Sequence, residues 1–200
     1  MADPAYIVDG VLTDGEAWVG LATTTLGSDT ASITFTSADD GSSLDWSQFM
    51  DLVVVAYARS DRVATDDRLN VKISGDTAAG TQYLTQGLRG NGSSASAALW
   101  TYGGDTYGGC TVGIVTAASA TANIFATSVT TFFDVNSGKY KSLISQSAAD
   151  QDGSGEVNLY AGTHKKTPPI TSLLFYPAFG SNLKDGSTIS LFGVLPRMVA

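Results

Sequence analysis

The sequence predicts an all-β fold, a jelly-roll-like antiparallel β-sandwich of about ten strands. Short runs of apolar and β-branched residues are separated by Gly, Asn, Asp and Pro at intervals of about ten residues. No segment keeps the apolar period of an amphipathic helix. A chain of 200 residues, 43% of them hydrophobic, can bury one full core. We therefore expect one domain over residues 17–195, an N-terminal arm over 1–16 and a C-terminal tail over 196–200.

Two runs near the end of the chain are expected to close the core. Residues 170–176 carry apolar side chains on both faces, which is typical of a strand in the middle of a sheet. Residues 188–195 alternate polar and apolar side chains as far as Phe192, so they predict a strand with one covered face. The segment between them is rich in turn-forming residues, among them Pro177, Gly180 and Asp185-Gly186.

The first half of the chain predicts a hairpin followed by further strands. Residues 18–26 and 30–36 flank the turn Gly27-Ser28-Asp29, and Ile33 and Phe35 alternate with threonines in the second run. A single helical turn is expected near residues 44–49. The remaining predicted strands are residues 51–59, 68–74, 81–86, 111–117, 121–135, 140–147 and 156–161.

Residues 87–109 are rich in glycine and serine and predict a long loop. The loop carries three aromatic residues, Trp100, Tyr102 and Tyr107. Aromatic side chains in a long loop favour an interface with another protein or stacking on a sugar ring. The alternative is that the loop folds over the edge of the core and binds nothing.

The charge balance argues against nucleic acid as a partner. The chain has a net charge of −8, only 15% of its residues are charged, and its Lys and Arg are scattered, so no basic groove is predicted. Arg59, Arg62 and Arg68 alternate with aspartates around residues 60–67, a pattern that predicts local ion pairs or the rim of an interface. The single Cys110 excludes an intrachain disulfide, and no signal peptide or membrane span is expected.

Neither a catalytic site nor a metal site is predicted. Oxygen-bearing side chains between Asp150 and Asn158 resemble the start of an EF-hand calcium loop, but Ala161 stands where the bidentate Glu should be. The simpler interpretation of this segment is a tight turn into a strand. The only histidine, His164, lies beside two lysines and is expected in an exposed loop. No cofactor is expected.

Several short motifs follow one another between residues 18 and 195. They are Ser32-Ile-Thr-Phe-Thr36, Ala58-Arg59-Ser60, Arg68-Leu-Asn-Val-Lys-Ile73, the Gly-Asn-Gly-Ser-Ser run at 90–94, residues 132–141 (FFDVNSGKYK), Gly153-Ser-Gly155 and residues 186–193. In this order they resemble a group of tailed-bacteriophage virion proteins of similar size. The chain departs from that group at Phe133-Asp134-Val135, where an Asp-Tyr pair is commoner.

The resemblance implies a non-enzymatic virion structural protein, made in the host cytoplasm and built into the particle. The favoured role is a capsid decoration (cement) protein that binds the major capsid protein on the outside of the head. The alternatives are a head- or tail-fibre component and a receptor- or carbohydrate-binding module. Self-association is expected, with a trimer as the favoured state. Together with the aromatic loop, Arg59, Arg62, Met198 and Val199 are the candidate interface residues.

Overall fold

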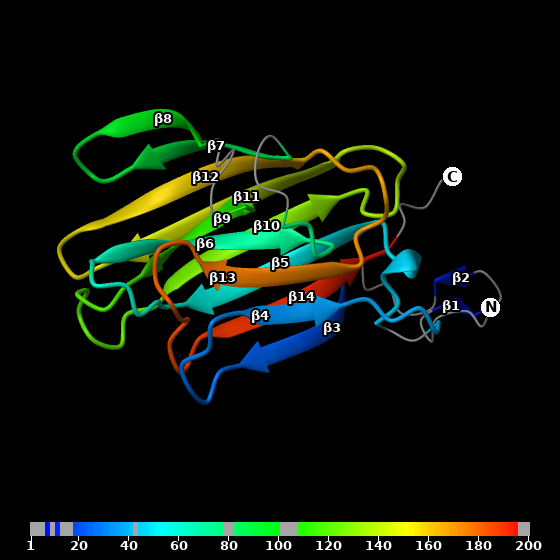
Figure 1. Cartoon of the computed structure of the whole chain (residues 1–200), viewed down its shortest axis with the longest axis horizontal. Coiled ribbons are helices and arrows are strands. Elements are labelled where there is room, and N and C mark those ends of the chain that lie inside the picture. Colours follow the sequence, from blue (N-terminus) through cyan, green and yellow to red (C-terminus); the bar gives the residue numbers. More distant parts are fainter. Residues whose placement is uncertain are drawn as a thin grey trace.

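The computed structural model describes residues 7–8, 11–12, 18–41, 44–77, 82–100 and 108–195, with only the backbone given for 7–8, 11–12 and Trp100. Two antiparallel sheets lie face to face, so the predicted all-β sandwich is confirmed (Figure 1). None of the described residues forms a helix of the length and apolarity that a membrane span requires.

The larger sheet has eight strands. Their order across the sheet is β3 (Trp18–Thr25), β14 (Thr188–Val194), β5 (Asp51–Ala58), β10 (Ala126–Phe133), β11 (Lys141–Asp150), β12 (Gly155–His164), β7 (Tyr83–Gly90) and β8 (Ala95–Trp100). The smaller sheet has four strands, in the order β4 (Ile33–Thr36), β13 (Ser172–Pro177), β6 (Asp66–Ile73) and β9 (Cys110–Thr116). A two-stranded sheet joins β1 (Ile7–Val8) and β2 (Val11–Leu12) within the expected N-terminal arm.

The chain crosses repeatedly between the two sheets, although β7–β8 and β10–β12 are consecutive strands of the larger one. One consequence is that the predicted hairpin of residues 18–26 and 30–36 is wrong. Strand β3 pairs with β14 in the larger sheet, and β4 pairs with β13 in the smaller one. The turn Gly27-Ser28-Asp29 therefore carries the chain from one sheet to the other. The single predicted helical turn is confirmed as the 3-10 turn Trp46–Gln48, in which the N–H of Ser47 donates to the capping side chain of Asp45.

The core lies between the sheets and is built from alternate residues of each strand. Phe35 and Phe175 meet edge to face with ring centroids 6.3 Å apart, and both are buried. Strand β13 lies between β4 and β6, which confirms the central position predicted for residues 170–176. Its inward residues Leu173 and Phe175 are fully covered. The alternation of burial along β4 and β13 is what a sheet with one core face produces.

Serine and threonine hydroxyls of the larger sheet hold strand β9 in place. The Ile114 N–H donates to Ser147 Oγ at 2.8 Å, and the Thr111 N–H donates to Thr85 Oγ1 at 3.2 Å. The Ser145 hydroxyl donates to the carbonyl of Val112. These side chains take the place of a neighbouring strand along part of β9, all of whose residues are buried. Part of the Ser and Thr content therefore serves the interior.

The larger sheet extends beyond the smaller one. In Figure 1, β4, β13 and β6 overlie β14, β5 and β10, strand β9 packs against β10, β11 and β12, and β8 lies at the far edge of the larger sheet. Residues 83–100 form an antiparallel hairpin, so the long loop predicted over residues 87–109 is wrong for its first part. The hairpin turn is closed by Asn91, whose side chain accepts hydrogen bonds from the N–H groups of Ser93 and Ser94. The sequence did not predict the strand Ala95–Trp100 because this segment is rich in small and polar residues.

Candidate interaction surface

The outer surface of the eight-stranded sheet is the most distinctive surface of the described protein. On β10, β11 and β12, and on β5 from Val54 onward, the odd–even alternation turns one set of side chains to the core and the other set to the outside. Large apolar residues are exposed on this outer set: Val55, Tyr57, Leu88, Leu99, Val129, Phe133, Ile144, Val157 and Leu159. We call this surface, from β3 to β8, the uncharged face.

Charged side chains are almost absent from the uncharged face. Among the outward residues of its eight described strands, only Asp51 and Asp150 carry a charge. Asp51 is buried, and its Oδ1 accepts the N–H of Asp134 at 2.7 Å. Asp150 is the last residue of β11 and lies at the rim. Because surface positions are normally rich in Lys, Glu, Arg and Asp, this arrangement is typical of a surface that another molecule covers.

Hydroxyl and amide groups supply what polarity the uncharged face has. At the β3 end, Thr25 Oγ1 and Thr188 Oγ1 lie 2.9 Å apart, and Thr23 donates to Ser190 Oγ at 3.0 Å. These side chains satisfy one another across the strands. The threonine-lined outer face predicted for residues 30–36 lies instead on β4 of the smaller sheet, where Thr34 and Thr36 are exposed.

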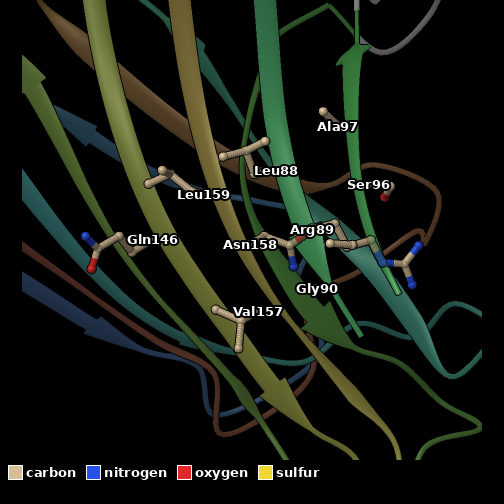
Figure 2. A pocket seen from close by; sticks show the side chains of 10 residues that line it. Leu88, Arg89, Gly90, Ser96, Ala97, Gln146, Val157, Asn158 and Leu159 are labelled. Atoms are coloured by element: carbon tan, nitrogen blue, oxygen red, sulfur yellow. The ribbon is translucent and has the colours of Figure 1, made fainter. Parts of the chain in front are cut away.

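Two adjoining hollows of about 740 and 530 Å³ form a groove along the uncharged face. Leu88, Ala97 and Leu159 line both hollows. Val157 and Gln146 extend the first hollow toward β11, and Ile144 and Leu99 line the second. Figure 2 shows the first hollow, with Leu88, Val157, Leu159 and Gln146 on neighbouring strands and with Ala97 and Ser96 on β8 at one margin. The groove can receive apolar side chains from a partner, but it brings together no acid and base that could perform chemistry.

The candidate calcium loop is a hairpin turn between β11 and β12. The N–H of Gln151 donates to the Ser154 carbonyl at 2.8 Å, and Asp150 Oδ1 accepts the N–H of Asp152 at 3.0 Å. Asp152 and Gly153 both take positive φ values, 60° and 103°. Within the part of the chain that the structure describes, no group of three His, Cys, Asp or Glu side chains is placed to hold a metal ion. This geometry matches the tight turn that was the simpler interpretation.

Glu156 follows this turn and forms a buried ion cluster. Its side chain is 2% exposed and pairs with Arg68 at 2.9 Å and with Nε of Arg89. The Asn158 amide donates to the same carboxylate at 3.0 Å. Burial acts to lower the pKa of Arg68, but the charges of Tyr160 and Glu156 outweigh it, so that pKa is raised. The guanidinium therefore stays charged, and the cluster joins β12 to β6 and β7.

The prediction that His164 lies in an exposed loop is wrong. His164 ends strand β12 and is 2% exposed, with its ring stacked on Tyr83 at a centroid distance of 4.6 Å. Its Nε2 lies 2.9 Å from Asp76 Oδ2. Burial lowers the pKa of His164 more than the nearby Asp76 raises it. Strand β12 continues three residues further than the sequence predicts, and the ring of Tyr83 and the carboxylate of Asp76 cover His164.

The predicted interface arginines lie within the protein's own contacts. Arg59 is buried, and its guanidinium donates to the carbonyls of Thr121 and Ile124 at 2.8 and 2.9 Å and to that of Ala120 at 2.9 Å. Arg62 donates to the Asp66 carbonyl at 3.0 Å and lies over the ring of Phe179 at 4.6 Å. These contacts are to backbone carbonyls and an aromatic ring, so the predicted ion pairs with the neighbouring aspartates are not what holds Arg59 and Arg62.

The other predicted interface residues lie outside what the structure describes. These are the side chain of Trp100 and the residues Tyr102, Tyr107, Met198 and Val199. In contrast, the sequence did not predict that the residues of the uncharged face share one surface. The signal was present, since residues 126–133, 142–149 and 157–163 contain no charged residue. Only the register of the strands shows that their outward members share one surface.

Comparison with models of known protein families and with curated proteins gives no match. The uncharged face and the order of the motifs are therefore the two observations that indicate a function.

Proposed function

We propose that this chain is a non-enzymatic structural protein of a bacteriophage particle, which decorates the outside of the head by binding the major capsid protein. The observation that carries the proposal is the uncharged face. The motif order in the sequence supports the phage assignment, and the separation of apolar from charged surface supports attachment through one side of the sandwich.

The dimensions of the uncharged face suit a stable protein contact. Eight strands spaced about 4.8 Å apart span roughly 34 Å, and the outward residues run for roughly 20 Å along the strands. The product is roughly 700 Å², close to the ~800 Å² that each partner contributes to a standard protein interface. A sheet of this size also presents one nearly continuous surface, which a shell lattice of repeated subunits can receive.

The polarity of the uncharged face defines the kind of partner surface. An apolar surface gains about 25 cal/mol for each Å² removed from water, whereas covering unpaired charges would cost free energy. Outward members such as Val55, Val129 and Ile144 can therefore be covered at little cost. Most acidic residues of the described part of the chain lie elsewhere, in the loops and on the smaller sheet, and the exposed ones among them would face solvent on a decorated particle.

The test is binding to expanded heads assembled from the major capsid protein of the same phage without this chain. Purified protein should cosediment with these heads to saturation. Val129→Lys and Ile144→Lys each place a charge in the middle of the uncharged face and should lower the affinity at least about tenfold. Thr34→Lys is the matched control, because Thr34 is exposed on the smaller sheet and its substitution should leave binding unchanged.

Four results would contradict this proposal. Wild-type protein that never binds heads excludes the decoration role, and equal binding by all three variants excludes the uncharged face as the contact. Location of the chain in the tail or fibres of the imaged particle would favour the fibre alternative. Specific binding on a glycan array would favour a receptor-binding module instead.

A further inference from the structure

We infer that two copies of this chain pair edge to edge through strand β8, antiparallel and about a two-fold axis at Ala97. This contact is separate from the proposed attachment to the capsid protein, because it uses the edge of the large sheet and leaves the uncharged face free. The inference rests on the hydrogen-bonding groups of β8 and on its side-chain sequence.

Strand β8 ends the eight-stranded sheet with alternate backbone groups unpaired. The bond from the Asn91 N–H to the Ser94 carbonyl at 3.1 Å sets the hydrogen-bonding phase of the β7–β8 hairpin. By that phase, Ser96 and Ala98 exchange bonds with β7, whereas the N–H and C=O groups of Ala95, Ala97 and Leu99 point away from it. No bond to another described residue satisfies these outward groups. Their natural partner is a second extended strand.

The edge lacks the features that normally prevent such pairing. Residues Ala95–Trp100 contain no charged residue and no proline, and the β7–β8 ladder has no register shift. The side chains of 95–99 are all exposed. At the opposite edge, the pairing of β3 with β14 shifts register between Leu191 and Phe192. A regular strand and a bulged strand match poorly, so a head-to-tail ring of β8 on β3, as a trimer would need, is disfavoured.

Strand β8 is complementary to itself in one register. Pairing Ala97 with Ala97 of a second copy places Ala95 opposite Leu99 in both halves. All outward backbone groups are then bonded, giving about six hydrogen bonds from three residue pairs. Each large Leu99 side chain meets a small Ala95, and Ser96 meets Ala98 on the other face. Because no charge lies on the strand, no like charges oppose each other across the axis.

Cysteine pairs test this register directly. Ser96 and Ala98 would form a non-hydrogen-bonded pair across the axis, with Cα atoms about 4.5 Å apart, a separation that a disulfide can bridge. The double variant S96C/A98C should yield a covalent dimer under mild oxidation. Neither S96C nor A98C alone should do so, because each faces the other position in the second copy. The native Cys110 is buried, so it should not form an intermolecular disulfide in any of the three variants.

A backbone substitution supplies the second test. Ala97→Pro removes the outward N–H that the pairing needs and spares the bonds to β7, a position where an edge strand tolerates proline. Sedimentation over a concentration series should show a monomer–dimer equilibrium for the wild type. The dissociation constant should rise about tenfold or more in Ala97→Pro and stay unchanged in the control Ala97→Ser.

Any of three results overturns the inference: a wild type that stays monomeric at all concentrations, a trimer that Ala97→Pro does not affect, or S96C/A98C that crosslinks no better than the single variants. Each of them leaves the head-binding result unaffected, so the two proposals fail independently.

Discussion

The backbone N–H of Gly180 donates a hydrogen bond to the buried Oδ2 of Asp67 at 2.8 Å, and the neighbouring N–H of Phe179 reaches the other oxygen at 3.1 Å. Asp61 binds the next two N–H groups of the same loop. Burial acts to raise the pKa of Asp61, but hydrogen bonds from Asn182 and Ser181 outweigh it, so the pKa is lowered. Two aspartates of one turn thus hold the connection between β13 and β14.

This close approach leaves no room for a side chain at residue 180. A Cβ added to Gly180 would lie 2.7 Å from Asp61 Oδ1 and 3.0 Å from Asp67 Oδ2. We expect Gly180→Ala to lower the free energy of unfolding by about 1–3 kcal/mol, because both carboxylates must shift away from the N–H groups that they bind. Urea unfolding measures the change. Gly27→Ala is the control, since its Cβ would have no neighbour within 4 Å.

Glu156→Gln should destabilise the protein through the arginines that it leaves behind. The substitution keeps the shape of the side chain but removes the charge between Arg68 and Arg89. Since Arg68 is mostly covered and Arg89 only partly, we expect a loss of about 1–3 kcal/mol in the free energy of unfolding. The comparison is Lys139→Ala, which removes an exposed pair with Asp134 and should leave the unfolding midpoint unchanged. Equal effects of the two substitutions would contradict a buried cluster.

Arg59→Lys is expected to be strongly destabilising although it keeps the charge. The planar guanidinium of Arg59 reaches three carbonyls within 3.0 Å from its two terminal nitrogens. A single ammonium group cannot satisfy these acceptors together, so about 1–3 kcal/mol of the free energy of unfolding should be lost. Protease cleavage of the segment 118–124 should also become faster. Arg62→Lys serves as the contrast, because Arg62 is only partly buried.

The stability of the wild type should fall as the pH drops below about 6.5. Burial holds the pKa of His164 below the ordinary histidine value of about 6.5, so the unfolded chain takes up the proton first and acidification favours unfolding. Free energies of unfolding measured from pH 8 to pH 5 should decline in this range for the wild type. In His164→Gln the decline should be smaller. A steeper decline in the variant would mean that the Asp76 contact, rather than burial, controls the pKa.

The strands could largely be predicted from the sequence because alternation reports burial locally. Ile33 and Phe35 in β4 and Leu173 and Phe175 in β13 face the core as their spacing indicates. Pairing was harder, because β3 and β4 are adjacent in the chain and yet belong to different sheets. The β7–β8 hairpin was hidden for another reason. Its alanines, glycines and serines have low β-propensity, and the strand forms because pairing with β12 and the Asn91 turn impose it.

The candidate site was less accessible to sequence reasoning than the fold was. Arg59 attracts attention as a charged residue, but only the three-dimensional structure shows the loop carbonyls around it. His164 has lysines as chain neighbours and Tyr83 and Asp76 as spatial ones. The uncharged face depends on register, since a shift of one residue in any strand would exchange its outer and inner sets.

Strand β9, whose backbone is bonded by Ser145, Ser147 and Thr85, has a consequence for the architecture of any assembly. Because those amide and carbonyl groups of β9 are already bonded, a strand from a second molecule would gain few hydrogen bonds by pairing with β9. Strand β4, at the other edge of the smaller sheet, has only four residues to offer. In the larger sheet, the edge strand β3 pairs with β14 through a register shift at Leu191 and Phe192, so β8 is the described edge best suited to main-chain pairing. On the proposed particle, a chain with one such edge would couple to a second copy and stop, which would protect a crowded shell against open-ended polymers.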